Sequence, residues 1–133
     1  MKALQDLAAP VSRILLSAIF ILAGINKIGG YYGTMQYMEA YGVPGALLPL
    51  VIAAEIGLGL AVAFGILSRL AALGLAVFTL VSAIIFHNDL GDQTQFVMFM
   101  KNLAITGGLL LIWIHGPGAY AIDNTGAMRR FSR

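Results

Sequence analysis

Four long apolar stretches dominate the chain, and short polar or glycine-rich breaks separate them. They run over residues 11–28, 46–67, 70–86 and 96–114, with a handful of charges inside them. At 1.5 Å per residue, such stretches form helices about 26–33 Å long, which matches the roughly 30 Å hydrocarbon core of a bilayer. The pattern predicts an all-α protein, a bundle of four transmembrane helices that forms a single membrane domain over residues 1–133.

The breaks contain the residues that usually end helices or form turns. Paired glycines at 29–30 follow the first stretch, a bare turn at 68–69 separates the second from the third, and residues 87–92 form a polar break before the fourth. A Gly-Pro-Gly sequence at 116–118 ends the fourth stretch. Residues 31–41 are rich in Tyr and Met, so we expect a short helix there, with its rings at the level of the lipid headgroups.

A cleavable signal peptide is the alternative interpretation of the first stretch, because Lys2 and a moderate apolar run are typical of one. However, Arg13 already lies at the start of the run and Lys27 closes it, without a convincing small-x-small cleavage site. We therefore expect a retained helix.

Composition narrows the class of protein further. Hydrophobic residues make up 59% of the chain and charged residues 11%, whereas about a quarter of the residues in soluble domains are charged. The net charge is only +2 and the basic residues are dispersed, so nucleic acid is not an expected partner. The chain has no cysteine, which excludes disulfides, cysteine-ligated clusters and a catalytic thiol within it.

The distribution of basic residues predicts the orientation in the membrane. If the four crossings alternate, Lys27 and Lys101 lie on one side and the other six share the opposite side. Those six are Lys2, Arg13, Arg69, Arg129, Arg130 and Arg133. The positive-inside rule then places both termini, including the tail at 115–133, in the cytoplasm.

Polar residues from all four helices are predicted to meet in the outer half of the bundle. Glu55 lies ten residues into the second stretch, where an ionisable group costs about 2.5–3.5 kcal/mol and needs a partner or a function. Lys27 ends the first helix and His87 ends the third on the same side. Lys101 and Asn102 lie about two turns into the fourth.

Two interpretations of this cluster are open. In the structural one, Glu55 forms a buried ion pair with Lys27 or Lys101 and fixes the helix register, while the other groups reach the headgroups. In the functional one, the residues form an outward-open pocket that binds a small anion or a quinone headgroup, or that relays protons. Two lysines and one glutamate leave an excess of positive charge, which suits an anionic or electron-rich ligand.

Arg13 and Arg69 are expected to act as inner anchors that bind phosphate headgroups, with capping of neighbouring helix ends as the alternative for Arg13. No metal site is expected. His87 and His115 fall at opposite membrane faces and cannot clamp one haem, and Glu55 alone within a span does not make a di-iron centre. No cofactor motif is evident, and a quinone is compatible with the predicted pocket.

An ordered set of residues extends over nearly the whole chain: Arg13, Phe20, Gly24, Lys27, Glu55, Gly59, Arg69, His87, the run at 99–104, and Gly107–Gly108. This set resembles the DoxX family of small four-helix membrane proteins. The resemblance implies an integral protein of the bacterial cytoplasmic membrane. The family takes its name from a subunit of a thiosulfate:quinone oxidoreductase, and some members are linked to redox complexes with a superoxide dismutase and a sulfurtransferase.

The leading hypothesis is a DoxX-like, redox-associated membrane subunit, either auxiliary or non-catalytic, whose pocket binds a quinone or an anion. In it, Lys27 and Lys101 hold the ligand, Glu55 balances charge or accepts a proton, His87 relays protons, and Asn102 orients its neighbours. Besides lipid, proteins of a redox complex and a second copy of the chain are the expected partners. The alternatives are a scaffold or assembly factor with a structural ion pair, and a small transporter. The transporter is the least favoured, because the chain shows no inverted repeat.

Overall fold

Five α-helices and two short 3-10 turns make up the computed structural model, which describes residues 2–125. The α-helices are α1 (Lys2–Gly29), α2 (Tyr31–Ala40), α3 (Leu48–Phe64), α4 (Ser68–Phe86) and α5 (Gln93–His115), and the 3-10 turns are η1 (Gly45–Leu47) and η2 (Ile122–Asn124). Within the described range there is no strand. Four segments, namely α1, η1 with α3, α4 and α5, are long and apolar enough to cross a membrane. The predicted all-α, four-span class is therefore confirmed.

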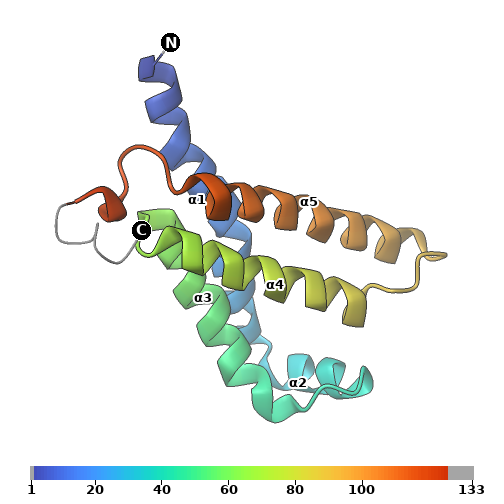
Figure 1. The fold of residues 1–133 in the computed structure, drawn as a ribbon. Helices are drawn as coiled ribbons and strands as arrows, with labels where there is room; N and C mark the ends of the chain where they lie inside the picture. The colour runs from blue at the N-terminus through green and yellow to red at the C-terminus, as the bar shows by residue number, and fades with distance from the viewer. Residues whose placement is uncertain (1, 126–133) are drawn as a thin grey trace.

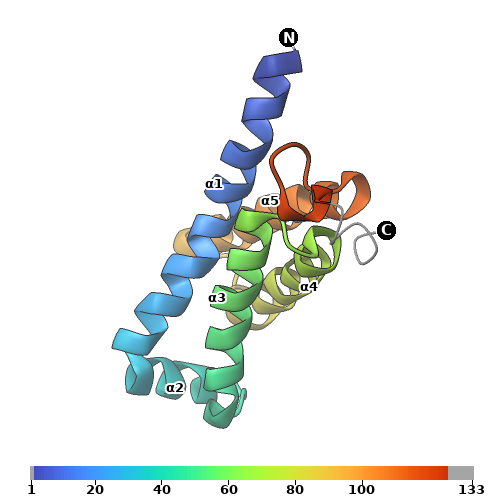
Figure 2. The same cartoon turned by 90° about the vertical axis from the view of Figure 1, so that its left-hand side faces the viewer.

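The long helices are arranged as two antiparallel pairs. The main packing contacts join α1 to α3 and α4 to α5, while α1 barely touches α5. In Figure 1 the α4–α5 pair runs across the α1–α3 pair at a wide angle, and Figure 2 shows α1 and α3 side by side. The core lies where α3, α4 and α5 meet, around Leu75, Val62 and Leu109.

Helix boundaries differ from those of the apolar stretches, both at the start of α1 and at the end of α3. Helix α1 begins at Lys2, well before the apolar run. A helix can continue through polar residues, whereas hydropathy marks only its apolar part. Helix α3 ends at Phe64, before the end of the second apolar stretch, since Gly65 adopts a left-handed backbone with φ of +74°. The short helix expected at 31–41 is present as α2.

One end of the molecule is closed by the chain that follows α5. This segment folds back onto the α3–α4 turn, and the carboxylate of Asp123 accepts hydrogen bonds from the backbone N–H groups of Leu67 (2.6 Å) and Ser68 (2.8 Å). Asp123 is buried and thereby caps α4, which has no capping side chain of its own. We call this the Arg13 end, and the opposite end of the α1–α3 pair the α2 end.

The side chain of Arg13 is buried inside the protein at this end. Its side chain is 2% exposed and donates to the carbonyl of Ala63 at 3.2 Å and to those of Ala119 and Tyr120, each at 3.0 Å. The interpretation of Arg13 as a lipid-headgroup anchor therefore needs correction. These three carbonyls accept no backbone hydrogen bond within the described residues, and one guanidinium satisfies all of them at once.

Candidate functional site

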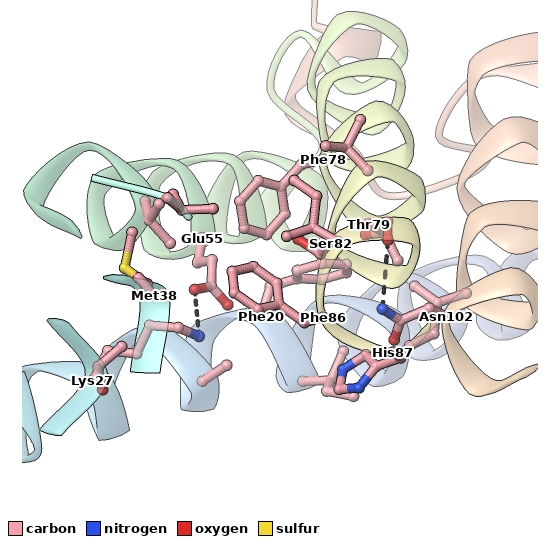
Figure 3. Close-up of a pocket in the computed structure, with 18 of the residues that line it drawn as sticks. Phe20, Lys27, Met38, Glu55, Phe78, Thr79, Ser82, Phe86, His87 and Asn102 are labelled. Atoms are coloured by element: carbon pink, nitrogen blue, oxygen red, sulfur yellow. Dashed lines mark hydrogen bonds and ion pairs between the residues drawn. The ribbon is translucent and has the colours of Figure 1, made fainter. Parts of the chain in front are cut away.

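A cavity of about 490 Å³ lies between the two helix pairs, toward the α2 end, and all five helices contribute to its wall. Figure 3 shows its lining. The polar lining residues are Lys27, Thr34, Tyr37, Glu55, Thr79, Ser82, His87, Lys101 and Asn102. The structure therefore brings all five residues that the sequence predicted to converge to the wall of one cavity.

Lys27 and Glu55 form an ion pair across the α1–α3 interface. Because the two helices are antiparallel, the last turn of α1 lies beside the second turn of α3, and Lys27 Nζ is 2.6 Å from Glu55 Oε1. Close packing of the helices depends on Gly24, where an added Cβ would lie 2.5 Å from Ile56 Cγ1. Lys27, and not Lys101, is thus the partner of the buried glutamate.

Glu55 lies near the middle of the span Gly45–Phe64, with its side chain 4% exposed. The ammonium of Lys27 is close enough for an ion pair, yet no donor among residues 2–125 meets Oε1 with hydrogen-bond geometry. At 2.6 Å the two groups are in direct contact, with no room for another atom between them. A carboxylate has about four acceptor sites, so the contact with Lys27 leaves acceptor capacity in the cavity wall.

A second polar group lies across the cavity, on α4 and α5. The side-chain amide of Asn102 donates to the Thr79 carbonyl at 3.4 Å, and Lys101 Nζ lies 3.4 Å from Met98 Sδ. His87 directly follows α4. Burial, and then the positive charge of Lys101, lowers the pKa of His87 from its usual value, which favours the neutral imidazole.

Aromatic rings separate the two polar groups. In Figure 3, Lys27 and Glu55 lie on one side of the cavity and His87 and Asn102 on the other, with the rings of Phe20 and Phe86 between them. The predicted cluster is thus two polar groups on a shared, largely apolar cavity, without contact between Glu55 and the α4–α5 group.

Aromatic side chains of α2 and of Tyr41, the residue that follows it, pack on α4 beside the cavity. Tyr37 stacks on Phe86 with ring centroids 5.3 Å apart, and Tyr41 approaches the same ring edge-on at 5.2 Å. Sequence reasoning assigned the tyrosines of this segment to the headgroup region and missed this contact. The four-residue spacing of Tyr37 and Tyr41, which puts both on one face of a helix, was the available signal.

The metal-binding residue types are scattered over the described part of the chain. No group of three or more His, Asp or Glu side chains is placed to hold a metal ion there. His87 and His115 lie at opposite ends of the α4–α5 hairpin, as their spacing predicted. The wall of the cavity itself presents two lysines, a carboxylate, an imidazole and an amide.

Four membrane-spanning helices, with a largely apolar cavity between two helix pairs, define the class as a small multi-pass membrane protein. The model of the DoxX family matches residues 8–88, more than half of the chain. The chain belongs to the DoxX family.

Three curated proteins are similar to this chain over most of its length. Inner membrane protein YqjF of Escherichia coli (strain K12) is 56% identical, covering 92% of this chain and 95% of that protein. Inner membrane protein YphA of the same organism is 36% identical, covering 85% and 86%. "Putative oxidoreductase CatD" of Bacillus subtilis (strain 168) is 33% identical, covering 74% and 78%. No solved structure matches the chain.

Proposed function

We propose that this protein is a redox-associated membrane subunit whose cavity binds a small electron-rich ligand, a quinone headgroup or an anion. The observation that carries the proposal is the convergence of five polar residues from α1, α3, α5 and the end of α4 on one apolar cavity. A polar side chain inside a membrane-spanning segment is costly, so its presence points to a partner or a function. The similarity to a Bacillus subtilis protein named as an oxidoreductase adds support.

The lining fits a quinone headgroup better than a compact anion. A quinone is a flat ring with acceptor carbonyls on opposite edges, and this cavity has aromatic walls between two groups of donors. Its volume of about 490 Å³ lies within the roughly 300–1,000 Å³ typical of small-molecule sites. A bound quinone would supply two-electron, two-proton redox chemistry.

Each polar residue has a distinct role in this proposal. Lys27 and Lys101 attract the two carbonyl oxygens from opposite sides, and Asn102 orients that end of the ligand. Glu55 balances the charge of Lys27, and its remaining acceptor sites take a proton. His87 is neutral at physiological pH and exchanges protons with water at the α2 end. Electrons would come from a partner protein, because a chain without cysteine cannot ligate an iron–sulfur cluster in the usual way.

Orientation in the bacterial inner membrane is part of the same proposal. Lys2 and Arg69 lie at the Arg13 end, and the positive-inside rule places this end in the cytoplasm. The basic residues Arg129, Arg130 and Arg133 lie outside the described residues. Two similar proteins of Escherichia coli are named as inner membrane proteins, which agrees with this location. The cavity then opens toward the periplasmic side.

A scaffold or assembly factor is the second candidate function, and the Lys27–Glu55 contact favours it. An ion pair that joins α1 to α3 fixes the relative position of two helices without any ligand. In that case Lys101, which is outside the pair, has no ligand to hold.

Lys101→Met separates the two candidates. We expect the purified variant to fold normally but to bind a short-chain benzoquinone about ten-fold or more weakly in calorimetry, since a hydrogen bond to a charged group is worth about 1.5–3 kcal/mol. Lys2→Met is the matched control, because it removes the same charge from an exposed position far from the cavity. Equal affinity in Lys101→Met and in the wild type would contradict a ligand-holding role.

A further inference from the structure

A second hollow lies at the Arg13 end, on the surface between α1 and α5. It is a groove of about 680 Å³, formed because the two helices barely pack against each other. Its walls are the apolar side chains Leu15 and Leu16 on one side and Leu111 and Ile112 on the other, with Gly108 between them. Since both helices are membrane-spanning, acyl chains are the solvent of this groove.

The groove ends in polar and basic groups. Ser12, Arg13 and His115 line it at the Arg13 end, next to Gly116. Arg69 lies beside that glycine, because a Cβ added to Gly116 would be 3.3 Å from both Nε and Nη2 of Arg69. Apolar walls that lead to cationic and hydrogen-bonding groups match the two halves of a phospholipid.

The balance of charge at this end also favours an anion. Arg69 is exposed and makes no hydrogen bond or ion pair with any residue from 2 to 125. The carboxylate of Asp123 is occupied by two backbone N–H groups. Asp6, the acidic residue of α1, does not line the groove. A phosphate beside Arg69 and His115 would therefore meet donors that have no protein acceptor among the described residues.

We propose that this groove is a binding site for an anionic phospholipid, with an acyl chain between α1 and α5 and the phosphate held by Arg69 and His115. Basic pockets between transmembrane helices are a recognised way of binding acidic headgroups. The site is separate from the cavity at the α2 end, so neither proposal depends on the other.

The test is a lipid titration of the purified, delipidated protein in detergent, read as the rise in unfolding temperature. Phosphatidylglycerol and phosphatidylcholine with identical acyl chains separate the headgroup from the chain. We expect a saturable rise with phosphatidylglycerol and a much smaller one with phosphatidylcholine. Arg69→Gln should weaken the apparent affinity about five-fold, the usual effect of one basic residue near a lipid surface. Lys2→Gln, the same change on an exposed part of α1, should leave it unchanged.

A second pair of variants tests the groove itself. Gly108→Leu fills it, and an added Cβ there meets Leu16 only at ordinary contact distance, 3.6 Å. Gly107→Leu makes the same change one residue away, where an added Cβ meets nothing within 4 Å. We expect only Gly108→Leu to abolish the phosphatidylglycerol effect. Equal stabilisation by both lipids, or equal losses in Arg69→Gln and Lys2→Gln, would overturn the proposal. These two charge variants decide it even if Gly108→Leu fails to fold.

Discussion

At the scale of single residues, the Lys27–Glu55 pair is the most consequential feature. A carboxylate in the middle of a span is tolerated because an ammonium lies 2.6 Å away, so each group depends on the other for its charge. Spacing alone predicted that Glu55 needed a partner but left Lys27 and Lys101 as alternatives. Only the antiparallel pairing of α1 with α3 decides between them, and that is a property of packing.

We predict strong coupling between these two residues. Lys27→Met should lower the unfolding free energy by about 3–5 kcal/mol, the usual cost of leaving one member of a buried pair alone. The double variant Lys27→Met/Glu55→Gln should recover most of that loss. Unfolding in mixed micelles of the wild type, Lys27→Met, Glu55→Gln and the double variant completes the double-mutant cycle. Additive losses would show that the pair contributes no coupling.

His87 makes the stability depend on pH. Its pKa is lowered by burial and by Lys101, so the unfolded chain binds a proton at a higher pH than the folded protein does. Stability should therefore be constant above the unfolded pKa, near 6.5, and fall as the pH drops below it. In His87→Gln this decline between about pH 6.5 and 5 should be shallower. A thermal-unfolding series across that range in both proteins measures it, and identical slopes would count against this role of His87.

At the scale of elements, the helices were predictable and their ends were not. Apolar stretches of the right length identified all four spans, because the requirement to match a bilayer is strong and local. The cap of α4 could not be predicted, since its acceptor, Asp123, is 55 residues away in the chain from Ser68. The same holds for Arg13, whose carbonyl partners belong to α3 and to the returning segment.

Removal of the Asp123 carboxylate should destabilise α4 at its start. Asp123→Ala leaves the N–H groups of Leu67 and Ser68 without an acceptor in a buried place, which costs about 1–3 kcal/mol for each such group. Asp92→Ala is the matched control. It removes the cap at the start of α5, but the N–H group of Thr94 that it leaves is exposed and can bond to water instead. We expect a clearly larger fall in unfolding temperature for Asp123→Ala, and similar falls would contradict the buried cap.

At the scale of the whole molecule, the two helix pairs meet at the core between α3, α4 and α5, and further contacts join them at both ends. Arg13 and Asp123 join them at one end, and the contact of α2 with Phe86 joins them at the other. The cavity lies between these contacts. The sequence predicted which polar residues share this region, since alternating crossings put the ends of neighbouring helices on one side. It did not predict the aromatic rings that divide them, because apolar residues carry no positional signal of that kind in a spanning helix.

Photolabelling with a short-chain azidoquinone tests the proposal that the cavity binds a quinone headgroup. Peptide mapping should find the label on cavity segments, around Phe20, residues 78–87 and residues 101–105. Excess unlabelled quinone should prevent that labelling. Label spread over the lipid-facing surfaces, unaffected by competitor, would contradict the claim.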